Sequence, residues 1–189
     1  MNRHVVVLIL LATVAVPVIA QQNRDPILPT RDAKCSDFAT LDVKNMTVKS
    51  LGRVFVFRRG KAYNFDLPEY EANKPDWEAT IEKDTTVSPA PGVAVRFLLI
   101  NDSHLTGSGW QFYLIGLRCA PSNSATGAAQ LQNVFEVRAM SLSVKELDND
   151  GIIFTTHPIY RKPATKYFSY KWDVDSATFK LEKTWMTSR

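Results

Sequence analysis

Apolar and polar residues alternate over much of the chain after residue 35, which is the two-residue period of β-strands. Arg53–Arg58 is rich in β-branched and aromatic residues, and apolar side chains alternate in Lys61–Asp66. The Arg59-Gly60 pair between these segments has the turn chemistry of a hairpin. The pattern therefore predicts two antiparallel strands joined at Arg59-Gly60.

Two long apolar runs lie in the middle of the chain, Val93–Ile100 and Trp110–Leu117. Apolar residues occupy both faces of each run, so we expect two strands at the centre of the core. The polar residues Asn101–Gly107 between them predict a hairpin connection. Upstream, Trp77–Ile81 alternates like a short strand, and Val87–Gly92, with two prolines, predicts a loop.

Other segments give weaker strand signals. Leu41–Val48 fits a strand with a bulge, and Val134–Val144 fits either a bulged strand, which we favour, or a helical stripe. Asp148–Gly151 is a tight-turn signal that lacks the ligand series of a calcium loop. The remaining predicted strands are Ile152–Thr156, Lys166–Trp172 and Phe179–Trp185.

These segments amount to about eight or nine short strands separated by turn signals. The fold class predicted is all-β, an antiparallel sandwich or barrel. It occupies residues 35–189 as a single domain. The polar residues 21–34, with two prolines, predict a flexible lead-in.

Residues 1–20 have the pattern of a secretory signal peptide. Arg3 provides a positive start, Val5–Val16 is apolar except for Thr13, and Val18-Ile19-Ala20 offers a cleavage site. The apolar run is shorter than the roughly 20 residues that span a bilayer. We therefore expect a secreted, extracellular protein with no transmembrane segment.

The chain has two cysteines, Cys35 and Cys119. In an oxidising compartment an even count favours one internal disulfide bond, and free thiols or an intermolecular bond are the alternatives. Closing so long a loop stabilises a fold by about 4.5 kcal/mol in the chain-entropy account. We expect the bond to staple the β-rich domain.

Two sequons for N-linked glycans occur, at Asn45 and Asn101. Asn101 follows an apolar strand and precedes a polar turn, so we expect it to be exposed. Asn45 falls in a predicted strand, where its face decides its accessibility. Both are predicted glycosylation sites.

The composition, 45% hydrophobic and 22% charged, is that of a globular protein with a core. The formal net charge of +4 is too small for a typical nucleic-acid-binding stripe. No phosphate-binding loop, nucleophile elbow or metal-ligand spacing occurs in the sequence, so we predict no catalytic residues, no metal site and no cofactor.

Two stretches resemble hemopexin-type repeats. One runs from Cys35 through Leu41-Asp42-Val43 to Lys61-Ala62-Tyr63, and the other is Tyr167–Asp173, shortly before Trp185. This resemblance implies blades of a propeller in a matrix-associated protein. It covers under half of the chain, whereas a propeller has about four to eight blades.

The length and the early cysteine, which we expect to pair with one on a late strand, also resemble insect-type lipocalins. That resemblance implies a barrel that carries a small apolar ligand. The Gly-x-Trp motif of lipocalins is absent, and Gly52-Arg53-Val54 stands where it would lie.

The function that we expect is a non-catalytic extracellular binding or interaction module. Its partner is an extracellular protein, a glycan or a small apolar ligand, and not a nucleic acid. The lipocalin-like carrier and the hemopexin-like matrix protein are the two alternatives. Neither the ligand nor the oligomeric state follows from the sequence.

Overall fold

The computed structural model describes residues 38, 40–63, 77–104, 109–120, 130–157 and 165–187. The predicted signal peptide (1–20), the lead-in (21–34) and Cys35 lie outside these residues. Within them no helix is long and apolar enough to cross a bilayer.

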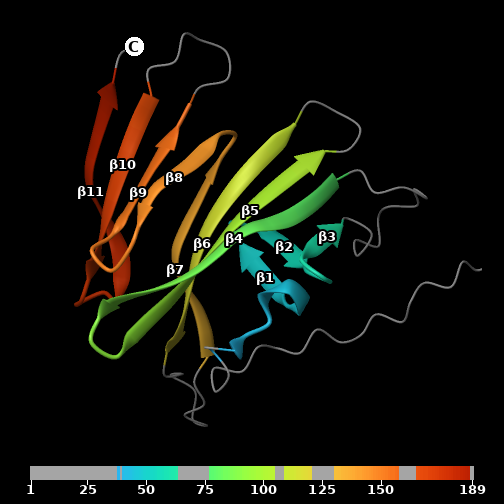
Figure 1. Ribbon diagram of the computed structural model, residues 1–189, viewed down its shortest axis with the longest axis horizontal. Coiled ribbons are helices and arrows are strands. Elements are labelled where there is room, and N and C mark those ends of the chain that lie inside the picture. Colours follow the sequence, from blue (N-terminus) through green and yellow to red (C-terminus); the bar gives the residue numbers. More distant parts are fainter. Residues whose placement is uncertain are drawn as a thin grey trace, which may run out of the picture.

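Three antiparallel sheets make up the described part of the chain (Figure 1). A short 3-10 helix, η2 (Val43–Asn45), precedes a hairpin of β1 (Thr47–Ser50) and β2 (Arg53–Val56). A central sheet has the order β3 (Lys61–Tyr63), β4 (Trp77–Ala90), β5 (Val93–His104), β6 (Trp110–Ala120) and β7 (Gln130–Ala139). A further sheet has the order β8 (Leu142–Leu147), β9 (Ile152–Thr156), β10 (Thr165–Asp173) and β11 (Thr178–Thr187).

The prediction of an all-β, antiparallel fold is confirmed. The strands are eleven in the described residues, instead of eight or nine, and each sheet has two edges. A closed barrel, including the lipocalin-like one, is therefore wrong. The stretch that resembles a hemopexin repeat divides between the β1–β2 hairpin and the edge of the central sheet, so it does not form one four-stranded blade.

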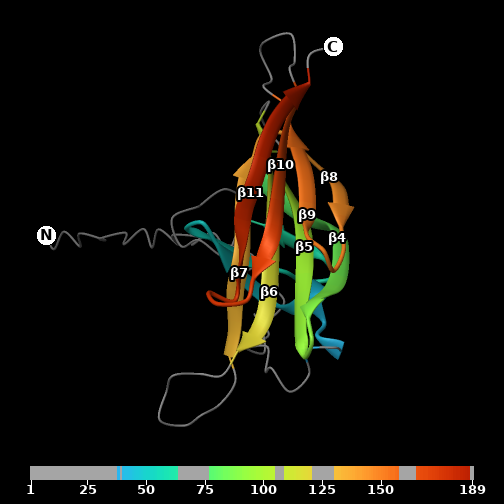
Figure 2. The same ribbon diagram turned by 90° about the vertical axis from the view of Figure 1, so that its left-hand side faces the viewer.

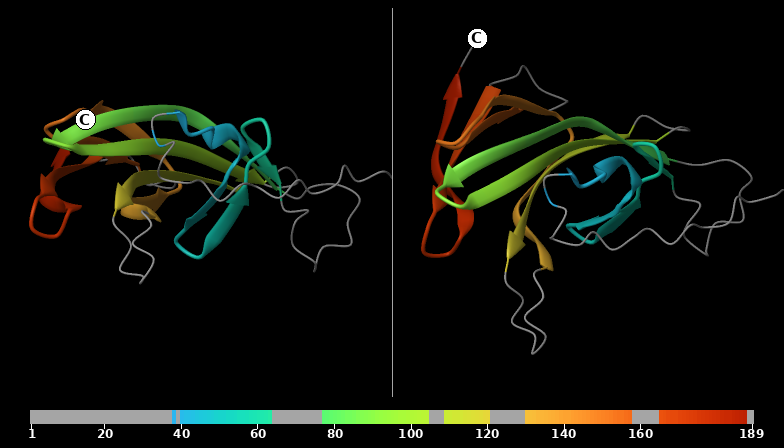
Figure 3. Two further views of the ribbon diagram at one scale, coloured as in Figure 1. Left: turned by 90° about the horizontal axis from the view of Figure 1, so that it is seen from below. Right: turned by 60° about the horizontal axis from the view of Figure 1, so that its bottom comes forward.

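Both faces of the central sheet are covered (Figures 2 and 3). Leu98, Ile100 and Ile115 pack with the β1–β2 hairpin on the side that we call the hairpin face. The side chains between them, such as Phe97 and Leu114, pack with β8–β11 on the opposite side, the sandwich face. Because successive side chains of a strand point to opposite faces, the apolar runs of β5 and β6 supply both cores.

Aromatic rings fill the core of the sandwich face. The Phe135 ring contacts Phe97, Tyr170 and Phe179, with centroids 5.9, 5.0 and 6.0 Å away. Gly116 lies beneath these rings, at a bulge between β6 and β7. A Cβ atom there would lie 2.8 Å from the Phe97 ring, so the close approach needs glycine.

The predicted hairpin at Arg59-Gly60 is only partly correct. The turn forms, with Arg58 and Lys61 exchanging backbone hydrogen bonds of 2.8 and 3.1 Å. Its two strands then separate, because β2 pairs with β1 and β3 pairs with β4.

Two other segments differ from their predictions. Val43–Asn45 is a 3-10 helix and not part of a strand, because the Asp42 side chain accepts a hydrogen bond from the Lys44 backbone N–H. The predicted loop Val87–Gly92 is mostly strand, since β4 continues to Ala90. β3 pairs only with the first residues of β4. The last residues of β4 therefore have a hydrogen-bonded neighbour, β5, on one side only, and Pro89 lies at this sheet edge, where a missing N–H breaks no bond to another strand.

The segment Val134–Val144 is extended, as we favoured, but it is two strands and not one. β7 ends at Ala139, and the chain crosses at Met140-Ser141 to begin β8 in the other sheet. The tight turn at Asp148–Gly151 is confirmed, because the Asp148 side chain accepts hydrogen bonds from the backbone N–H groups of Asp150 and Gly151.

The hairpin tip provides a test of this fold. Leu51 and Gly52 have φ values of 46° and 80°, and Leu51 is 46% exposed. This two-residue turn favours asparagine at its first position. Leu51→Asn should therefore raise the free energy of unfolding by about 1 kcal/mol in urea denaturation. Val54→Asn, at an exposed position in β2, is the control and should give no gain. A loss on Leu51→Asn would contradict this turn geometry.

Candidate binding pocket

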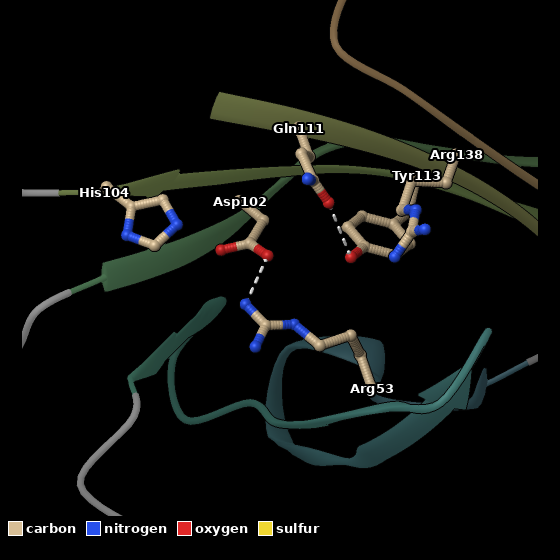
Figure 4. Close-up of a pocket in the computed structure, with 6 residues that line it drawn as sticks. All are labelled: Arg53, Asp102, His104, Gln111, Tyr113 and Arg138. Atoms are coloured by element: carbon tan, nitrogen blue, oxygen red, sulfur yellow. Dashed lines mark hydrogen bonds and ion pairs between the residues drawn. The ribbon is translucent and has the colours of Figure 1, made fainter. Parts of the chain in front are cut away.

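Polar side chains gather at one end of the hairpin face, where β5, β6 and β7 meet the edge of the β1–β2 hairpin (Figure 4). They surround a pocket of about 250 Å³. The lining residues are Arg53, Asp102, His104, Gln111, Tyr113 and Arg138.

The strand period places these groups together. On β5, Asp102 and His104 continue the row of Leu98 and Ile100 on the hairpin face. Asp102 pairs with Gln111 of β6. Tyr113, two residues further along β6, pairs with Arg138 of β7. On the hairpin face, the rows of side chains that form the core thus continue into polar residues on three adjacent strands.

Arg53 reaches the pocket from the hairpin. Its Nη2 donates a hydrogen bond of 2.8 Å to Oδ2 of Asp102, and its guanidinium lies 4.8 Å from the centre of the Trp77 ring. Burial lowers the pKa of Arg53, but the hydrogen bond and the charge of Asp102 outweigh it, so the pKa lies above its usual value. The ion pair joins β2 to β5.

Asp102 is the buried group of the pocket. Its side chain is 3% exposed, and its Oδ1 has no hydrogen-bond partner. In Figure 4 this oxygen points toward His104, while Oδ2 points toward Arg53. A buried carboxylate oxygen without a hydrogen-bond donor is unfavourable by a few kcal/mol. This oxygen is closed to solvent, so a ligand does not reach it unless the groups around it move.

Arg138 and His104 lie at the solvent-exposed edge of the pocket. The side chains of both residues are exposed, and neither forms a hydrogen bond or ion pair with the described residues. The Tyr113 hydroxyl donates to Oε1 of Gln111 at 3.2 Å, which leaves the amide nitrogen of Gln111 available. Because Asp102 balances Arg53, the charge left over in the pocket is that of Arg138.

This arrangement provides hydrogen-bond donors, one buried acceptor and a net positive charge. None of the six lining residues is a serine, threonine or cysteine that could act as a nucleophile. No cluster of three His, Cys, Asp or Glu side chains in the described part of the chain could hold a metal ion. The lining groups can donate and accept hydrogen bonds and can pair with an anion.

Of the two cysteines in the predicted disulfide, only Cys119 is among the described residues. Cys119 lies near the end of β6, half-buried and opposite Leu131 of β7. No cysteine among the described residues carries a free thiol. Cys35 lies outside the described residues, so the bond between the two stays a prediction.

The Asn45 side chain is exposed at the end of η2. Its Nδ2 donates to Asp42 at 2.7 Å, and its Oδ1 accepts from the Arg59 backbone N–H at 2.8 Å. It lies in the 3-10 helix and not in a strand. The exposed Asn45 amide therefore links η2 to the turn at Arg59.

Asn101 is half-buried, contrary to the exposure that we expected. The strand does not stop at Ile100 but continues to His104, so Asn101 lies between β4 and β6. Its Nδ2 donates to Glu82 at 2.8 Å, and its Oδ1 has no partner. Occupancy of either sequon by a glycan stays a prediction.

Sequence reasoning missed the pocket altogether. Asn101–Gly107 read as a polar connection, so Asp102 and His104 were assigned to a loop. The two-residue alternation continues from Leu98 through Asp102, and that extension was the available signal. Nothing in the sequence placed Arg53 beside a residue 49 positions away.

Comparisons with family models, with curated proteins and with solved structures find no match for this chain.

The ion pair leads to an asymmetric prediction. Arg53→Met leaves the buried Asp102 charge without its partner, and we expect it to lower the free energy of unfolding by about 3 kcal/mol. Asp102→Asn removes the buried charge and leaves Arg53, which is one-third exposed, accessible to water. It should cost less, and the double variant should be more stable than Arg53→Met alone. Urea denaturation at neutral pH measures all three. Equal losses for the single variants, with no recovery in the double, would contradict a buried pair.

Proposed function

We propose that this protein is a secreted, N-glycosylated and disulfide-stapled binding module that performs no catalysis and takes a polar ligand in the pocket. The observation that carries the proposal is a pocket lined by six polar side chains, in which the Arg138 guanidinium and the His104 ring have no hydrogen-bond partner among the described residues. Arg138 and His104 are exposed at the ends of the polar row, so a ligand can reach them from solvent.

The lining favours a polar ligand over the apolar one of the carrier alternative. Apolar ligands are held by pockets lined mostly by hydrophobic and aromatic side chains. Here Tyr113 is the only aromatic lining residue, and it presents a hydroxyl that is bonded to Gln111. We therefore prefer a polar small molecule or a glycan as the partner.

The sequence of residues 1–20 supports secretion, and the even number of cysteines agrees with an oxidising compartment. The sequon at Asn101 is compatible with a working pocket. Asn101 and Asp102 are consecutive residues of β5 and point to opposite faces. A glycan on Asn101 would leave the pocket on the hairpin face open.

The described residues also support the staple. Arg96 of β5 donates to the backbone oxygen of Leu41 at 2.7 Å and to that of Phe38 at 3.5 Å. Arg96 pairs with Leu117, which lies two residues before Cys119 on β6. Residue 35 is three residues from Phe38 and lies at most about 10 Å from it. A bond from Cys35 to Cys119 is thus within reach.

Expression of the full chain in eukaryotic secretory cells tests secretion and glycosylation. We expect the protein in the medium, with Gln21 as its first residue by mass spectrometry. An enzyme that removes N-linked glycans should lower its mass. Asn45→Gln and Asn101→Gln should each abolish one step of that decrease. A cell-retained product that keeps Met1 would overturn secretion, and a secreted product of unchanged mass would overturn glycosylation alone.

The staple has its own test. Peptide mapping of the non-reduced protein should recover one linked pair that contains Cys35 and Cys119. The double variant Cys35→Ser/Cys119→Ser should lose about 2–5 kcal/mol of stability, seen as a lower melting temperature. Wild-type protein in reductant is the matched control and should melt like the variant. Two alkylatable thiols in the native protein, with an unchanged melting temperature, would disprove the bond.

A further inference from the structure

We propose that two copies of this protein associate through β11, so that the β8–β11 sheets of both copies join into one continuous antiparallel sheet. The pocket lies on the central sheet, so this inference is independent of the pocket and of its ligand. It rests on the free edge of β11, on a bulge that selects one register and on the charges that meet in that register.

β11 is a long strand at the edge of its sheet. It has 10 residues, and in the described part of the chain it pairs only with β10. Figures 1 and 2 show it at the outside of its sheet. In an antiparallel pair, alternate residues direct their backbone N–H and C=O groups away from the partner strand. β11 therefore presents a row of backbone groups to which a further strand can add.

The other long edges of the described chain have features that oppose such an addition. Pro89 lies at the free edge of β4 and has no N–H group. Asn133 of β7 donates a hydrogen bond of 2.7 Å to the backbone oxygen of Lys49, so the β1–β2 hairpin lies against that strand. On β8, Lys145 and Glu146 are exposed and form no ion pair with the described residues. Unpaired charges on an edge strand disfavour its pairing with another chain.

The exposed side chains of β11 differ from those of β8. Lys180 and Glu182 already form ion pairs with β10, with N–O distances of 2.9 and 2.7 Å. Neither leaves an unpaired charge at the edge. Leu181 and Met186 are 52% and 67% exposed, so this edge also carries apolar surface that a second copy would cover.

A bulge in β11 places two consecutive side chains on one face of the sheet. Ser169 of β10 pairs with Lys183 and Tyr170 pairs with Leu181, so Glu182 is the extra residue. Tyr170 packs toward the central sheet, so Ser169 points to the opposite side, which we call the outer face. The Ser169 hydroxyl donates to Glu182 at 3.1 Å, which puts Glu182 on the outer face as well.

Lys183 shares the outer face with Glu182. Its Nζ lies 5.5 Å from the centre of the Trp185 ring, and this ring stacks on Tyr167, with centroids 5.0 Å apart. Tyr167 is two residues from Ser169 and therefore points the same way. The inward positions are then Phe179, Leu181, Thr184 and Met186, and the outward ones are Lys180, Glu182, Lys183 and Trp185.

This arrangement selects one register for two β11 strands related by a twofold axis. Residues that face each other across an antiparallel pair must have their side chains on the same face. An axis between Glu182 and Lys183 meets this condition along the whole strand, from Thr178 opposite Thr187 to the centre. A shift of one residue would put inward side chains opposite outward ones on both sides of the bulge.

Opposite charges meet in the selected register. Glu182 of each copy faces Lys183 of the other, and the twofold axis makes two such pairs. Lys180 faces Trp185 of the other copy, where a cation–π contact can form. Phe179 faces Met186, and no two like charges are directly opposite. The edge of β11 is thus complementary to itself.

Sedimentation equilibrium of the secreted full-length protein tests the association. One strand from each copy makes a small contact, so we expect a weak dimer, with monomer predominant at about 1 µM and dimer at about 1 mM. Hydrogen exchange locates the contact. The backbone amides of β11 should become more protected at the higher concentration, and those of β8 should not change.

Charge reversal tests the register. Glu182→Lys and Lys183→Glu each place like charges opposite in both symmetry-related pairs, so each should weaken dimerisation about tenfold or more. The double variant Glu182→Lys/Lys183→Glu restores opposite charges and should recover most of the affinity. Glu146→Lys makes the same change of charge at an exposed position of β8 and is the matched control, which should dimerise like the wild type. Circular dichroism checks that each variant keeps its fold.

The remaining outcomes overturn the inference. A protein that stays monomeric at about 1 mM does not form this dimer. A dimer in which the β11 amides gain no protection uses another surface. Single reversals without effect, or a double variant no stronger than the single ones, reject the pairing of Glu182 with Lys183. None of these results decides the proposed binding function, because the pocket residues lie outside β8–β11.

Discussion

The burial of both faces of β5 and β6 is the constraint on which the rest of the structure depends. Alternate side chains of these two strands enter separate cores, one beneath the β1–β2 hairpin and one against β8–β11. A strand buried on both faces must be covered on both, so neither outer layer can be removed without exposing apolar surface. Gly116 shows how closely the central sheet packs on its sandwich face, because any side chain at this position would contact the Phe97 ring.

The pocket exists because polar residues continue the same rows. Past Ile100, the hairpin face carries Asp102 and His104, and the hairpin covers the first of them almost completely. A carboxylate in that position is stable only with a cation, and Arg53 supplies it from the hairpin itself. The contact that holds the hairpin against the sheet is therefore also the contact that fixes one wall of the pocket.

Much of the fold could be predicted from local pattern, and the pairing of elements could not. The period of two identified β9, β10 and β11 nearly to the residue, because their turns carry strong signals such as Asp148–Gly151. The prolines of Val87–Gly92 indicated a loop. Composition cannot show that this end of β4 lies at the edge of the sheet, where proline is tolerated. The turn at Arg59-Gly60 was likewise correct, while the partners of its strands were set by contacts elsewhere.

The pocket escaped prediction for a related physical reason. Asp102, in the polar stretch after Ile100, is buried because the β1–β2 hairpin, from much earlier in the sequence, lies over it, and local sequence does not encode that contact. The backbone at Phe38 and Leu41 is held on the same face by Arg96, whose guanidinium also forms two hydrogen bonds with Asp84, of 2.7 and 2.6 Å. The proposed disulfide would act beyond this clamp, at Cys119. The Arg53–Asp102 ion pair and the hydrogen bonds of Arg96 to the backbone of Phe38 and Leu41 thus hold the N-terminal part of the described chain on one face of the sheet. Where the row of side chains on that face turns from apolar to polar, the same attachment produces a partly enclosed site with an unsatisfied acceptor.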